Sequence, residues 1–111
     1  SLFRIKSTHM FAVIYRFKVK EGSQEVFEKS WRDLTKLIFE YEGSLGSRLH
    51  QASGLDYIAY AQWPDEETWK NSGGKMPPEA NEVRKKMRES TLEIETLYAM
   101  QVKDDLLKKV S

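Results

Sequence analysis

The chain carries few side chains that could transfer protons near neutral pH. His50 is the one histidine outside residues 1–9, and an imidazole titrates in the range that suits a general base. It falls near the end of an expected strand, on the face of Gly46 and Arg48, so a surface or subunit-interface histidine is the competing interpretation. Arg16 and Arg48 fall on the same expected face, where a guanidinium could bind an anion or, as we favour, pair with a carboxylate.

Aromatic side chains at alternate strand positions offer a second kind of chemistry. Tyr15, Trp63 and Tyr98 are predicted to share the sheet side that the helices cover, and the helices offer Trp31 and Met87 to the same space. A buried tyrosine hydroxyl must find a partner and can donate a hydrogen bond to a phenolate. Ordinary core packing is the competing interpretation for each of these residues.

Other reactive groups are absent or poorly arranged. The sequence contains no cysteine, which excludes disulfides, thiolate metal sites and a cysteine nucleophile. Residues 73–78 read Gly-Gly-Lys-Met-Pro-Pro and lack the Gly-Lys-Ser/Thr ending of a phosphate-binding loop. We expect a flexible connector there, which its position beside Trp63 and Trp69 makes a natural lid for a pocket between sheet and helices.

Composition limits the class of protein further. The 111 residues include 18 basic and 17 acidic side chains, interspersed along the chain, so no basic stripe for nucleic acid is present. The acidic pairs Glu93/Glu95 and Asp104/Asp105 fall at strand or chain ends, where carboxylates are normally solvated. We therefore expect neither nucleic-acid binding nor a metal site.

Residues 1–9 lack the apolar run of a secretory signal. The pair His9-Met10 is also what a common cloning junction leaves, so we expect 1–9 to be a vector-derived or disordered leader and 10–111 to form a single domain. No apolar run approaches the roughly 18 residues of a membrane span. A cytoplasmic protein without membrane contact is the expectation.

Hydrophobic periodicity divides the domain into strands and helices. Alternating apolar residues predict a strand over 10–20, and apolar residues spaced three and four apart predict a helix from its N-cap Ser23 to the C-terminal glycine Gly43. The later elements are a hairpin of strands 44–52 and 55–63 with a turn at 53–54, a short helix capped by Asp65, a helix after Pro77-Pro78, and a fourth strand that begins between Leu92 and Thr96.

This order of elements predicts a four-stranded antiparallel sheet with its helices on one face, an α+β fold of the ferredoxin-like kind. The other face would still carry apolar side chains, which need cover. A second copy of the sheet is the simplest cover, so we expect a homodimer. The apolar residues assigned to this face are Ala12, Ile14, Ile58, Tyr60, Leu97 and Ala99.

Three segments resemble the antibiotic biosynthesis monooxygenase superfamily of dimeric α+β barrels. They are the opening strand at 11–22, the Glu-Gly-Ser-Leu-Gly segment at 42–46, and the Gln-Trp-Pro-Asp-Glu-Glu-Thr-Trp segment at 62–69. The resemblance covers about residues 10–105. It implies the ferredoxin-like fold and the homodimer, but it does not choose among the activities found in the superfamily.

The resemblance implies a possible chemistry. Cofactor-independent oxygenases of this superfamily hold a phenol or hydroquinone between sheet and helices, deprotonate it, and let the carbanion meet dioxygen. Carried onto this chain, the catalytic residues would be Tyr15 and Trp63, and the pocket would include Trp31, Met87 and Tyr98. The substrate would be a small phenolic or polycyclic metabolite, no cofactor would be needed, and the base in an alternative assignment would be His50.

Two other functions remain open. One is a non-catalytic dimeric barrel that binds a small apolar ligand. The other is a haem-degrading relative, whose resemblance implies an asparagine on the first strand, a tryptophan after the third, and an axial histidine on a following helix. Here Tyr15 stands at the first position, Trp63 keeps the second, and no histidine follows His50.

Overall fold

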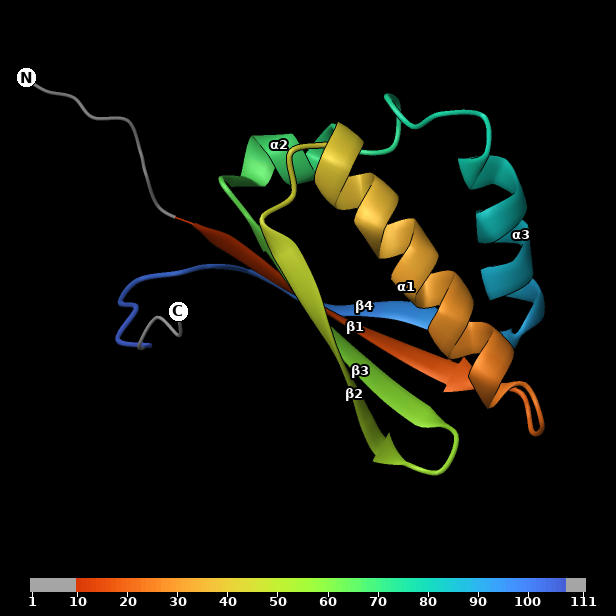
Figure 1. Ribbon diagram of the computed structural model, residues 1–111. Helices are drawn as coiled ribbons and strands as arrows, with labels where there is room; N and C mark the ends of the chain where they lie inside the picture. Colours follow the sequence, from red (N-terminus) through yellow and green to blue (C-terminus); the bar gives the residue numbers. More distant parts are fainter. Residues whose placement is uncertain (1–9, 108–111) are drawn as a thin grey trace, which may run out of the picture.

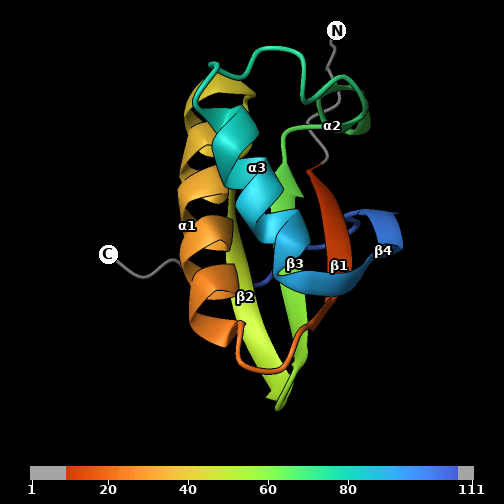
Figure 2. The same cartoon turned by 90° about the vertical axis from the view of Figure 1, so that its right-hand side faces the viewer.

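The computed structural model describes residues 10–107, so the leader expected over 1–9 lies outside the described part of the chain. Four strands form one antiparallel sheet in the order β2-β3-β1-β4. Helices α1 and α3 lie side by side on one side of that sheet (Figures 1 and 2). The elements are β1 (Phe11–Val19), α1 (Gln24–Tyr41), β2 (Gly46–Ser53), β3 (Asp56–Trp63), α2 (Glu66–Lys70), α3 (Ala80–Glu89) and β4 (Thr91–Gln101). The predicted fold class is confirmed.

The residues predicted at the helix ends occupy those positions, but not all of them make the expected hydrogen bonds. Gly43 follows α1 with a φ of 82°, as a C-terminal glycine should. Asp65 caps α2 by accepting a hydrogen bond from the Thr68 backbone N–H at 2.8 Å. Ser23 occupies the predicted N-cap position of α1, but its side chain makes no capping hydrogen bond. The Gly22 N–H instead donates to Gln24 Oε1 at 3.1 Å, so a side chain inside the first turn satisfies the backbone.

Two predicted boundaries are displaced by local hydrogen bonds. Strand β2 begins at Gly46 rather than at residue 44. The Ser44 hydroxyl accepts a hydrogen bond from the Gly46 N–H at 2.9 Å, which forms a local turn before pairing with β3 starts. Strand β4 begins at Thr91, before the expected range, because α3 ends directly before it at Ser90.

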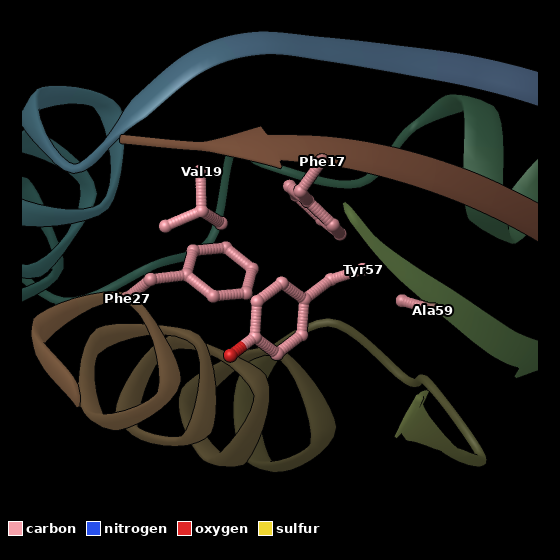
Figure 3. Packing of buried hydrophobic residues seen from close by; sticks show 5 residues of the cluster. All are labelled: Phe17, Val19, Phe27, Tyr57 and Ala59. Carbon is pink, nitrogen blue, oxygen red and sulfur yellow. The ribbon is translucent and has the colours of Figure 1, made fainter. Parts of the chain in front are cut away.

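The core lies between the sheet and α1. Figure 3 shows Phe17, Val19, Phe27, Tyr57 and Ala59 packed together, each at most 4% exposed. The Phe27 ring centroid lies 4.9 Å from that of Tyr57 and 5.0 Å from that of Phe17. The Tyr57 hydroxyl points toward α1 (Figure 3) and donates to Glu28 Oε2 at 2.5 Å. This cluster fixes the distance between α1 and the centre of the sheet.

A bulge in β4 changes which side chains face the helices. Strand β1 pairs Ile14 with Tyr98 but Tyr15 with Thr96, so β4 has one extra residue at this point. An extra residue reverses the alternation beyond it. Tyr98 therefore shares a face with Ile14 and is 61% exposed, while Ala99 pairs with Val13 on the helix side. The predictions that Tyr98 faces the helices and that Ala99 faces away are both wrong.

The sheet face away from the helices, here called the open face, carries Ala12, Ile14, Ile58 and Tyr60 as predicted, while Leu97 is the extra residue of the bulge. The register places Ile14 opposite Tyr60 and Arg16 opposite Ile58 on this face. Arg16 pairs with Asp56 at 3.2 Å and with Glu95 at 3.7 Å. The guanidinium therefore pairs with carboxylates of its own chain.

Candidate functional site

A cavity of about 170 Å³ lies between the sheet and the two longer helices. Tyr15 of β1 and Trp63 of β3 line its sheet side, and Trp31 of α1 and Met87 of α3 line its helix side. These four residues are those that the sequence predicts for the pocket. The fifth, Tyr98, lies on the open face and does not line the cavity.

The rest of the cavity wall is apolar or carries hydroxyl groups. Among the described residues, Tyr15 is the one lining side chain with a titratable group. The remaining polar lining residues are Thr35 and Ser47, and the apolar ones are Phe17, Ile38, Ala59, Ala61 and Ile94. The space therefore suits an uncharged or weakly polar aromatic molecule.

The Tyr15 hydroxyl is held in a defined position. Trp69 Nε1–H of α2 donates a hydrogen bond to Tyr15 Oη at 2.9 Å. Burial raises the pKa of the Tyr15 phenol above its usual value, and the hydrogen bond from Trp69 partly offsets this rise. The phenol is therefore neutral at neutral pH and keeps its proton for donation.

Trp69 reaches Tyr15 because α2 starts at a fixed point. Asp65 Oδ1 accepts hydrogen bonds from the Thr68 N–H at 2.8 Å and from Thr68 Oγ1–H at 2.7 Å. The Trp69 ring also packs against Phe11, with 5.5 Å between ring centroids. Trp69 is not among the residues that the sequence predicts for the site. The available signal was its place one turn into a capped helix that directly follows Trp63.

Trp63 carries an unusual polar atom. The residue is 4% exposed, and its buried Nε1–H has no hydrogen-bond partner among residues 10–107. A buried donor without a partner is uncommon because it loses its bond to water without replacement. Less than 1 Å² of this nitrogen is exposed, so it lies behind the cavity wall and only the Trp63 ring faces the cavity.

His50, Arg16 and Arg48 lie outside the cavity. His50 is exposed on β2 opposite Ile58, and its Nδ1 lies 3.1 Å from the Ile58 carbonyl oxygen. Arg48 pairs with Tyr60, so both residues share the open face with Arg16. None of the three lines the cavity that Tyr15 and Trp63 share.

The connector after α2 is tied to the end of α1. Glu42 is 6% exposed, and its Oε2 accepts a hydrogen bond from the Lys75 backbone N–H at 2.9 Å. Arg84 of α3 donates to the Gly73 carbonyl oxygen at 3.4 Å. No residue of 73–78 lines the cavity, so a lid role for this segment remains a prediction.

Larger hollows occur on the outside of the molecule. One of about 310 Å³ runs between α1 and α3. Its Lys29 and Asp33 pair with each other at 2.8 Å, and no buried polar atom in it lacks a partner. Within residues 10–107 no group of three or more His, Cys, Asp or Glu side chains could hold a metal ion. We therefore take the smaller aromatic cavity as the candidate site.

No helix in the described part of the chain is long and apolar enough to cross a membrane.

Comparisons with known proteins agree with this architecture. SnoaB, a cofactor-independent oxygenase from Streptomyces nogalater, superposes with a TM-score of 0.70 at 16% identity over 90% of this chain and 99% of that chain. Rv0793 from Mycobacterium tuberculosis superposes with a TM-score of 0.68 at 14% identity over 88% of this chain and 99% of that chain. At these identities the likeness establishes the fold alone.

Sequence comparison adds the family. No curated protein matches the chain at a significant level of sequence similarity. The antibiotic biosynthesis monooxygenase family model matches residues 10–74, which is more than half of the 111-residue chain. This match and the fold together establish that the chain belongs to the antibiotic biosynthesis monooxygenase family.

Proposed function

We propose that the protein is a cofactor-independent monooxygenase that acts on a small aromatic metabolite in the cavity between sheet and helices. The observation that carries the proposal is the meeting of Tyr15, Trp31, Trp63 and Met87 around one space of about 170 Å³. The fold shared with SnoaB, which is described as a cofactor-independent oxygenase, supports the same reaction class.

The proposed reaction needs no cofactor because the substrate supplies the electrons. An activated CH₂ group beside a phenolic ring loses a proton, and the resulting carbanion is oxidised by O₂. Overall, CH₂ and O₂ give C=O and H₂O, which balances atoms and electrons. Since Tyr15 is neutral and no other titratable group of residues 10–107 lines the cavity, the proton would leave to water from an acidic substrate.

Tyr15 and Trp63 have separate proposed roles. A hydrogen bond from the Tyr15 hydroxyl would stabilise negative charge on the substrate oxygen as the carbanion forms. The rings of Trp31 and Trp63 and the side chain of Met87 would hold the substrate ring. Tyr98 has no role in this proposal, because it lies on the open face.

A second function is favoured by one specific observation. The described residues that line the cavity include no group that is charged near neutral pH, so a barrel that binds an apolar aromatic ligand without turnover also fits. Turnover separates the two functions. A Soret shift with one haemin per subunit would instead support a haem-binding relative.

Oxygen uptake with a panel of single-ring phenols tests the proposal, and anthrones, whose fused rings exceed a space of about 170 Å³, serve as the size control. We expect uptake by the wild type, reduced uptake by Tyr15→Phe, and unchanged uptake by His50→Ala, because His50 lies outside the cavity. Loss of one hydroxyl contact should weaken substrate binding by about 0.5–1.5 kcal/mol. Uptake abolished by His50→Ala but unaffected by Tyr15→Phe would show that the site is on the other face.

We also propose that the protein is a homodimer joined through the open face. Tyr98 is 61% and Met100 37% exposed there, and a second sheet would cover both. We propose separately, from the sequence, that the protein is cytoplasmic.

A further inference from the structure

The hydrogen bond between Trp69 and Tyr15 restricts what Tyr15 can do. An indole N–H can only donate, so the 2.9 Å contact uses the Tyr15 oxygen as an acceptor. The phenolic O–H then remains as the group that Tyr15 can offer to a molecule in the cavity. Burial favours the neutral phenol, which keeps that proton in place.

The rest of the cavity wall favours a ligand that pairs with the Tyr15 O–H. Trp63 contributes its ring to that wall, but less than 1 Å² of its Nε1 atom is exposed, so this N–H does not open onto the cavity. The described residues of the wall include no negatively charged side chain, and the Tyr15 O–H therefore favours a ligand with a hydrogen-bond acceptor. A ligand without an acceptor would leave the Tyr15 donor unpaired.

The cavity volume limits the size of that ligand. At about 170 Å³ the space is close to the roughly 150 Å³ of an engineered cavity that binds benzene. One aromatic ring with a short substituent fits such a volume. A second fused ring would have to extend out of the cavity.

We infer that the cavity selects single-ring ligands through an acceptor oxygen, and that Trp69 is a positioning residue that fixes Tyr15 as the donor to that oxygen. The inference rests on the proposed function, since it uses the same cavity. It adds the chemical class of the ligand and a residue that acts without touching the ligand. The juxtaposition that carries it is the Trp69–Tyr15 hydrogen bond beside the aromatic cavity that Tyr15 lines.

Two ligands of nearly equal shape measure how much the acceptor oxygen contributes to binding. Acetophenone carries a carbonyl oxygen where α-methylstyrene carries a CH₂ group. Isothermal titration calorimetry should show acetophenone binding about 3- to 10-fold more tightly than α-methylstyrene to the wild-type protein. 2-Acetylnaphthalene, with a second ring, should bind more weakly than acetophenone.

The variants separate positioning from packing. Trp69→Phe keeps a ring against Phe11 but removes the N–H, so the preference for acetophenone should fall toward equality. Trp31→Phe is the matched control, because it changes a cavity wall without touching the Tyr15 hydrogen bond; its two affinities should change together. If Trp69→Phe does not fold, Tyr15→Phe removes the O–H that Trp69 positions and should lower the same preference.

Each of the remaining outcomes would contradict a different part of the inference. Equal binding of the two probes to the wild type would overturn the acceptor inference and leave the aromatic site standing. An unchanged preference in Trp69→Phe would remove the positioning role, and tighter binding of 2-acetylnaphthalene would remove the size limit. No binding of any probe would overturn the inference together with the proposed aromatic site.

Discussion

Trp63 combines a packing role with an unused polar group, and substitutions can separate the two. Trp63→Ala should cost roughly 3–5 kcal/mol in the free energy of unfolding, because a buried ring is lost. Trp63→Phe should change stability little, since the indole N–H has no partner among residues 10–107, but it should weaken ligand binding. Denaturant unfolding and calorimetry measure both effects. If Trp63→Phe binds ligand like the wild type, the pocket role assigned to Trp63 is wrong.

The raised pKa of Tyr57 predicts that the protein loses stability in alkaline solution. Burial, and then its hydrogen bond to Glu28, raises the pKa of Tyr57 to about 12, above its ordinary value of 10.0. The folded state therefore keeps a proton that the unfolded state loses first. The resulting stabilisation is complete below pH 10 and disappears as the pH rises through 12, an effect of about 1 kcal/mol because solvent screens the part-buried hydroxyl.

The measurement compares the wild type with Tyr57→Phe by urea unfolding from pH 8 to 12. The difference in stability between the two proteins should shrink by that amount as the pH rises. Tyr15 also contributes to the alkaline loss, because burial raises its pKa, but it contributes equally to both proteins. A difference that does not depend on pH would contradict the account of Tyr57.

The sequence predicts individual site residues where regular periodicity controls them. Tyr15 and Trp63 follow from alternation along β1 and β3, and Trp31 and Met87 follow from helical spacing. Tyr98 does not, because the bulge in β4 depends on pairing with a strand far along the chain. The Trp69–Tyr15 bond joins residues 54 positions apart, and such a contact exists only once the fold has formed.

At the level of elements, the turn from α1 into β2 depends on Gly43. Its φ is 82°, and a Cβ there would lie 3.3 Å from Thr68 Cγ2 of α2. Gly43→Ala should therefore lower the free energy of unfolding by more than the roughly 1 kcal/mol that a left-handed alanine costs. Gly22 has the same φ of 82° with nothing within 4 Å of its Cβ position, so Gly22→Ala should show the backbone cost alone. Equal losses in urea unfolding would exclude the contact with Thr68.

The elements themselves are largely predictable because their local signals agree. Apolar alternation, the glycine after α1 and the aspartate before α2 each mark an element that the structure contains. The exact ends are less predictable, since short-range hydrogen bonds compete with regular pairing. Ser44 shows this competition, because its hydroxyl holds the Gly46 N–H and delays the start of β2.

For the whole molecule, the open face predicts the oligomeric state. We expect sedimentation to show a dimer at micromolar concentration for the wild type. Tyr98→Glu should shift it to monomer, because a charge would be buried between the sheets. Phe39→Glu is the control, since Phe39 is similarly exposed at 57% but lies on α1, away from the open face. A wild type that sediments as a stable monomer would contradict the proposed dimer.

The central claim is that the cavity lined by Tyr15 and Trp63 binds an aromatic ligand. A ¹H–¹⁵N spectrum titrated with p-cresol tests it most directly, because the chain has three tryptophans whose indole N–H signals can be assigned by Trp→Phe variants. The account predicts shifts for Trp31 and Trp63, whose side chains line the cavity, and for Trp69, whose N–H donates to Tyr15. Unchanged indole signals, or shifts confined to amides between α1 and α3, would contradict it.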